Sequence, residues 1–180
     1  IKIKQQFLGW YTDDGRVFAP GETATFTEDT RLYQAAGAIV YNYDDLNLLL
    51  GKGWWFIKLG ADITTTKKIS TCSGPSGTMS ILDMNGHSIT TSSAQAFGAG
   101  RSGLMIVGEG EITHTGTTSF FDTSYHSYNP NNIRLYIGRD ITVTSSAVLY
   151  VSNDVSGTSG LPKIGIWGNA TAAGICKLDK

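Results

Sequence analysis

Charged residues are scarce in this chain, and neither sign is in excess. Asp, Glu, Lys and Arg make up 16% of the 180 residues, and the net charge is −1, whereas ordinary domains contain about 25% charged residues. Proteins that bind nucleic acid or anionic membranes carry a basic surface, so the composition argues against both partners. No run reaches the ~18 apolar residues of a membrane-spanning helix.

Cysteine is also scarce, because only Cys72 and Cys176 are present. A disulfide between them and a pair of buried thiols are both consistent with the sequence. A disulfide would join positions 72 and 176 and close a long loop, which in the chain-entropy model stabilises a fold by roughly 4–5 kcal/mol.

Motifs for catalysis and metal binding are missing. The chain has no Gly-x-Ser-x-Gly nucleophile and no His-x-x-x-His pair, and its three histidines are scattered. We interpret His87 as a turn residue that hydrogen-bonds to a neighbouring repeat. Glu109 and Glu111 could form a hydrolytic carboxylate pair, but Gly110 between them indicates a turn with both acids in solvent. We therefore expect no catalytic residue, cofactor or metal ion.

Glycine, serine and threonine dominate instead, and they favour short strands joined by tight turns. One phrase recurs, consisting of an apolar residue, a glycine-containing turn and a β-branched pair. Its pairs are Ile63-Thr64, Ile89-Thr90, Ile112-Thr113 and Ile141-Thr142, with Ala170-Thr171 as a degenerate last copy. Repeats of 20–30 residues indicate stacked units that cannot bury their apolar faces alone. The repeat predicts a β-solenoid with one rung for each copy. Asp62, Asp83 and Asp140 recur near the same place in the repeat and are expected to accept hydrogen bonds at turns.

Residues 1–36 differ from the repeats and predict four short β segments, one of them at Thr23–Thr27. Residues 39–53 are the helical candidate, because Asn42 or Asp44 can cap it and leucines follow before glycine. We expect this helix to cover the open end of the solenoid. Residues 115–132 are expected to form the longest loop.

Two resemblances arise from these residues. Phe7–Gly15, with its Gly-Trp-Tyr-Thr-Asp core, and the later Glu28–Tyr33 segment resemble the C-terminal part of the Listeria–Bacteroides repeat. That β-grasp-like module is found on bacterial surface proteins. Ile81–Thr90 resembles the pectate-lyase-like β-helix superfamily. Together they imply an all-β chain with a partial β-grasp-like module at 1–36, a linker and capping helix at 37–53, and a short right-handed parallel β-helix of about four to five rungs at 54–180.

The resemblances imply a non-catalytic structural or adhesive protein, secreted or on a bacterial cell surface, that associates with itself or with other surface proteins. A fibre could form through exposed β-edges. The alternative is a carbohydrate-binding or polysaccharide-degrading β-helix, with Trp54 and Trp55 as glycan contacts. The chain begins at Ile1, which fits either removal of a leader or excision from a longer adhesin. The residues expected at the assembly edges are Ile1, Lys2, Ile3, Lys4, Ile175 and Leu178.

Overall fold

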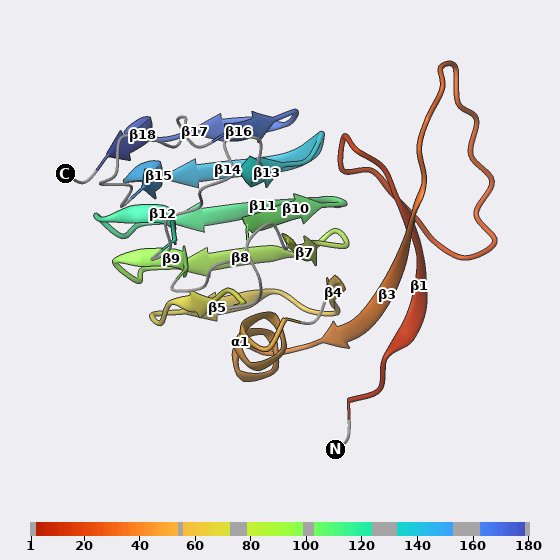
Figure 1. Cartoon of the computed structure of the whole chain (residues 1–180). Coiled ribbons are helices and arrows are strands. Elements are labelled where there is room, and N and C mark those ends of the chain that lie inside the picture. The colour runs from red at the N-terminus through yellow and green to blue at the C-terminus, as the bar shows by residue number, and fades with distance from the viewer. Residues whose placement is uncertain are drawn as a thin grey trace.

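The computed structural model describes residues 3–53, 56–72, 79–98, 103–123, 133–152 and 163–178. Within these ranges the chain is all-β apart from one helix, and its strands form three sheets (Figure 1). Sheet A has eight strands, in the order β16 (Lys163–Ile166), β13 (Ile133–Ile137), β10 (Gly103–Val107), β7 (Met79–Asp83), β4 (Phe56–Leu59), β3 (Tyr33–Val40), β1 (Gln6–Tyr11) and β2 (Val17–Phe18).

Sheets B and C have five strands each. Sheet B has the order β17 (Asn169–Thr171), β14 (Asp140–Ser145), β11 (Glu109–His114), β8 (Ser88–Thr91) and β5 (Ile63–Thr65). Sheet C has the order β18 (Gly174–Leu178), β15 (Val148–Ser152), β12 (Ser119–Thr123), β9 (Gln95–Gly98) and β6 (Ile69–Ser70).

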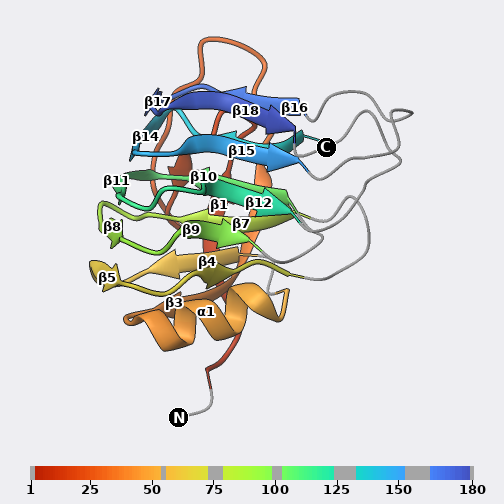
Figure 2. The same cartoon turned by 90° about the vertical axis from the view of Figure 1, so that its left-hand side faces the viewer.

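From β4 onward the chain passes through sheets A, B and C in turn and then starts again, and we call each such passage a circuit. Every strand of a circuit pairs in parallel with its counterpart in the next one. The circuits stack on one another, as both views show (Figures 1 and 2). The prediction of an all-β chain with stacked parallel strands is confirmed.

The recurring phrase lies in sheet B, but its fourth copy was predicted at the wrong position. Ile112 pairs with Ile89 on one side and with Val143 on the other, while Ile141 pairs with Gly110. The fourth copy is thus Val143-Thr144, two residues later than predicted. Side chains alternate along a strand, so Ile141 and Val143 both face inward, and the apolar pattern could not separate them. The stacked positions are Ile63, Ile89, Ile112, Val143 and Ala170.

The main core lies between the three sheets, and sheet C supplies its largest side chains. Phe97, Phe120, Phe121 and Tyr150 are at most 2% exposed. Phe97 packs edge-on against Phe120 at a centroid distance of 5.4 Å. The prediction of one long loop over residues 115–132 is wrong where it includes β12, and residues 124–132 lie outside the described ranges. The strands of sheet C are short and flanked by Ser, Thr and Gly, so their pattern resembles that of loops.

Helix α1 (Tyr43–Gly51) confirms the predicted helix. Asn42 is its N-cap, and its Oδ1 accepts the backbone N–H of Asp45 at 2.9 Å. The helix buries Leu46, Leu49 and Leu50 against the main core. The helix also hydrogen-bonds to the edge of β6, because Asn47 Oδ1 accepts the backbone N–H of Ser70 at 2.7 Å. The helix therefore covers one end of the stack, at the bottom of Figure 2.

The N-terminal strands form an antiparallel hairpin that continues sheet A. β1 pairs with β2 and β3, and β3 then pairs in parallel with β4. β3 crosses the predicted boundary between residues 36 and 37, so the hairpin and the stack share one sheet. The strand predicted at Thr23–Thr27 is wrong, because those residues are exposed and form no ladder. β1 and β3 rise along one side of the stack in Figure 1.

The hairpin also encloses a second core against the outer face of sheet A. Its buried members are Leu8, Ala35, Phe56, Ile81, Met105, Val107 and Tyr136. The turn between β1 and β2 contacts the corners of two later circuits. Gly108 N–H donates to Gly15 O and Arg139 N–H donates to Asp14 O, both at 2.8 Å. The Tyr136 hydroxyl donates to Asp13 O, and burial raises the pKa of Tyr136 to about 12. The hairpin thus acts as a clamp across successive circuits.

Candidate functional site

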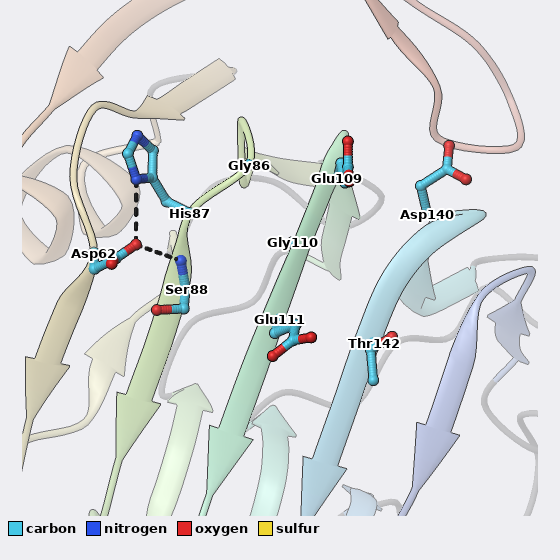
Figure 3. Close-up of a pocket in the computed structure, with 9 residues that line it drawn as sticks. All are labelled: Asp62, Gly86, His87, Ser88, Glu109, Gly110, Glu111, Asp140 and Thr142. Atoms are coloured by element: carbon cyan, nitrogen blue, oxygen red, sulfur yellow. Dashed lines mark hydrogen bonds and ion pairs between the residues drawn. The ribbon is translucent and has the colours of Figure 1, made fainter.

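A polar hollow crosses four strands of sheet B at the end where these strands begin. Its volume is about 400 Å³. Figure 3 shows its side chains on neighbouring parallel strands. The residues that line it are Asp62, Gly86, His87, Ser88, Glu109, Gly110, Glu111, Asp140 and Thr142.

His87 lies at one end of this hollow and confirms its predicted role as a turn residue. Its Nδ1 lies 3.2 Å from Oδ1 of Asp62, which belongs to the preceding circuit. The same Oδ1 accepts the backbone N–H of Ser88 at 2.9 Å. These contacts, led by the Ser88 hydrogen bond, lower the pKa of Asp62. The turn itself needs left-handed backbone, with φ of +50° at Asn85 and +79° at Gly86.

Three acids occupy the middle of the hollow, and all three are exposed. Glu109 pairs in register with Asp140, and Glu111 pairs with Thr142. Neighbouring strands are about 4.8 Å apart, so Glu109 and Asp140 lie side by side, and Glu111 lies two residues further along β11. The expectation that Glu109 and Glu111 face solvent is confirmed, but the turn predicted at Gly110 is wrong, because Gly110 lies within β11 and pairs with Ile141. Among the described residues, no group of three or more His, Cys, Asp or Glu side chains is placed to hold a metal ion.

Asp83 does not line this hollow, whereas Asp62 and Asp140, which were predicted to be equivalent to it, both do. It ends β7 in sheet A, and its carboxyl group is buried under the hairpin. Its Oδ1 accepts the backbone N–H of Asn85 at 2.9 Å, so its predicted role at a turn is confirmed. Desolvation raises the pKa of Asp83. No local pattern indicated that Lys58 would be its neighbour.

A buried histidine lies at the corner between sheets B and C. His114 is 1% exposed and takes the position that serine or threonine holds in other circuits. At Thr65, Thr91 and Ser145 the side-chain oxygen accepts the backbone N–H two residues later. His114 Nε2 donates to Ser93 O and its Nδ1 accepts from Ser145 Oγ, both at 2.9 Å. Both ring nitrogens are therefore satisfied in the neutral form.

We expect His114 to make the fold sensitive to acid. Desolvation lowers its pKa below the usual 6.5 in the folded chain. The unfolded chain then binds the proton more readily, so stability is full above pH 6.5 and falls as the pH drops toward the folded pKa. The urea midpoint should be lower at about pH 5.5 than at about pH 7.5. His114→Gln should remove most of this difference, and an unchanged difference would contradict the assignment.

The predicted assembly residues lie at opposite ends of the chain. Ile3 packs against the main core and Lys4 is exposed, and neither belongs to a strand. The Ile3 side chain thus contacts the core of its own chain, and the role of this segment in assembly stays a prediction. Ile175 and Leu178 belong to β18, the outermost strand of sheet C, and the Ile175 side chain is 55% exposed. Ile1, Lys2, Trp54 and Trp55 lie outside the described residues.

A disulfide between Cys72 and Cys176, one of the two alternatives that the sequence left open, does not fit the strand order within a single chain. Cys72 follows β6 and Cys176 lies in β18, at opposite edges of sheet C with three strands between them. Four strand spacings amount to about 19 Å, whereas bonded cysteines have Cα atoms less than about 7 Å apart. The Cys72 side chain is half-buried.

Comparison with known proteins gives no relative. No protein-family model, no curated protein and no solved structure matches the chain. No helix among the described residues is long and apolar enough to cross a membrane.

Proposed function

We propose that this chain is a non-catalytic structural or adhesive part of a bacterial surface protein, secreted and able to associate with a second copy of itself. In this proposal the stacked circuits are a short right-handed parallel β-helix of about four to five rungs. The N-terminal hairpin is the remaining part of a β-grasp-like surface repeat. The observation that carries the proposal is the edge formed by β16, β17 and β18, which no other described strand pairs with.

The last circuit leaves one edge of each sheet open. Among the described strands, β16, β17 and β18 each pair on one side only. An open edge offers backbone N–H and C=O groups to any further strand, and proteins commonly protect such edges with charges or proline. The edge strands contain two charged residues, Lys163 at the start of β16 and Lys177 near the end of β18, whereas residues 164–176 contain no Asp, Glu, Lys, Arg or Pro. Most of this edge therefore lacks the usual protection.

Apolar side chains are exposed beside the same edge. Ile166, Trp167 and Ile175 are 38%, 45% and 55% exposed. Trp167 stacks on Tyr136 of the preceding circuit at a centroid distance of 3.8 Å. An uncharged apolar surface can meet an identical surface without like-charge repulsion. These features support contact between two copies through their last circuits.

The other end of the stack is covered by α1, which limits how many copies such contacts can join. α1 covers the main core there, and Asn47 satisfies part of the β6 edge. Each copy therefore offers one open end, and two copies joined through it complete a closed, two-fold pair. A fibre, as the sequence suggested, requires a second surface. We propose the pair as the basic unit of assembly.

The test is the mass of the native chain in solution, by light scattering after size exclusion, with negative-stain electron microscopy. We expect a pair at high concentration for the native chain. Ile175→Lys, which places a charge on the open edge, should shift the equilibrium to the monomer. Leu48→Lys is the matched control, because Leu48 is 46% exposed on α1 at the covered end, and it should leave the pair intact.

A monomeric native chain at every concentration would contradict self-association and favour the alternative of glycan binding. The hollow on sheet B supports that alternative, because exposed carboxylates and hydroxyls in a 400 Å³ recess suit the hydroxyl groups of a sugar. A glycan array with the native chain would then identify the ligand. Glu111→Ala should weaken its binding.

A further inference from the structure

Lys58 and Asp83 form a pair on the outer face of sheet A. They are register neighbours on β4 and β7, which belong to successive circuits. Lys58 Nζ lies 3.5 Å from Asp83 Oδ2, and the side chains are 15% and 1% exposed. Such a pair is costly to bury as ions, because the desolvation penalty can exceed the attraction between the charges.

In the described part of the chain, only one of the two carboxyl oxygens of Asp83 accepts a hydrogen bond. Its Oδ1 accepts the Asn85 N–H, whereas no described group donates a hydrogen bond to its Oδ2. The neighbours of Asp83 on the same face include Val107, its register partner on β10, and Ile81, both buried in the second core. Burial raises the pKa of Asp83 and so favours its neutral acid.

A small cavity lies over the pair. It measures about 300 Å³ and is open to solvent, and besides Lys58 and Asp83 its lining includes Val17, Glu22 and Glu109. The recess offers room for a small product to leave. An amine and a carboxylic acid in contact, with apolar neighbours on sheet A and an outlet for water beside them, are arranged for condensation.

We propose that Lys58 and Asp83 join in the folded chain through an amide bond between Lys58 Nζ and Asp83 Cγ. A proton first passes from the ammonium group to the carboxylate, which gives a neutral amine and a neutral acid. The amine lone pair then attacks Cγ. The Cγ–Oδ2 bond breaks, and Oδ2 leaves as water with one further proton from Nζ. The sum is ammonium plus carboxylate giving amide plus water, so the step needs no oxidant, cofactor or second enzyme.

The fold holds the amine and the acid close together, whereas in free solution they would have to meet by diffusion. Parallel neighbours hold their Cα atoms about 4.8 Å apart, within reach of a lysine side chain. Fixing two reactants in contact corresponds to effective concentrations of about 10⁵ M or more in favourable cases. The product would bind β4 covalently to β7 and tie two successive circuits together. This inference does not depend on the proposed self-association.

Intact-mass measurement of the purified native chain under denaturing conditions is the direct test. We expect a mass lower than that of the sequence by one water molecule. Trypsin should not cleave after Lys58, and the peptide that contains Lys58 should remain joined to the peptide that contains Asp83. A lighter species that grows during incubation of the folded chain would also support the reaction.

Two lysine variants separate the bond from a simple ion pair. Lys58→Arg keeps the positive charge, but the guanidinium stays protonated and cannot act as the nucleophile, so its mass should equal its own sequence mass. Lys67→Arg changes an exposed lysine and should still show the loss of water. A folded native chain with the full sequence mass after long incubation, and with unlinked Lys58 and Asp83 peptides, would overturn the proposal.

Discussion

Replacing Ile112 with alanine should lower the free energy of unfolding by about 3 kcal/mol. Ile112 is 1% exposed and lies in the main core, stacked between Ile89 and Val143. Replacement with alanine removes methyl and methylene groups from this stack and leaves a cavity. The parallel strands that pair with β11 on both sides prevent the neighbouring side chains from filling that cavity. The loss combines the transfer free energy of these groups with the cost of the cavity.

The adjacent residue is the control. Thr113 is on the same strand, but its side chain points to the opposite face and is exposed. Thr113→Ala should change the free energy of unfolding by less than about 0.5 kcal/mol. Urea denaturation followed by circular dichroism measures both variants. Equal losses, or a larger loss at Thr113, would show that the faces of β11 are reversed.

Replacing Gly15 with alanine should destabilise the chain by about 2–5 kcal/mol, because two costs add. Gly15 has φ of +85°, where a side chain costs about 1–2 kcal/mol. Its added Cβ would also lie 2.6 Å from the Gly138 Cα, and relieving such overlap typically costs about 1–3 kcal/mol. Because Gly15 and Asp14 hold the corners of two circuits, the hairpin clamp should loosen.

Gly21→Ala is the control that separates the cost of a positive φ from the cost of the contact with Gly138. Gly21 has a similar φ of +81°, but a Cβ there would meet nothing within 4 Å. This variant should show only the backbone cost. Urea denaturation gives the two free energies, and limited proteolysis reports opening of the hairpin, which should be faster only in Gly15→Ala. Equal behaviour of the two variants would mean that the clamp contributes nothing to stability.

Local signals in the sequence were enough to predict several elements. The α1 helix follows from its Asn42 cap and spaced leucines, and the corner at Asn85-Gly86 follows from residues that tolerate a left-handed backbone. The exposure of Glu109 and Glu111 was predicted from a turn at Gly110, but it results from alternation along β11. These features depend on neighbours close in the chain, so the sequence contains their causes.

Features that depend on distant neighbours were missed or misplaced. The shift from Ile141 to Val143 arose because both face inward and only the adjacent strand selects between them. The sequence left both a disulfide and two thiols open for Cys72 and Cys176, whereas the stacking of circuits sets the separation of β6 and β18. The segment of β12 was placed in a loop, because a short strand gains stability from pairing rather than from its own propensity.

The sequence by itself determined that this chain builds stacked, mostly uncharged β-strands, because the period of its apolar and glycine positions needs only local chemistry. Only the tertiary structure decided which side chains meet across circuits. It placed Lys58 beside Asp83, His114 between Ser93 and Ser145, and the hairpin turn against Gly138. Such contacts join residues more than twenty positions apart, and their partners are chosen by strand register and by the path of the hairpin, which no local pattern encodes.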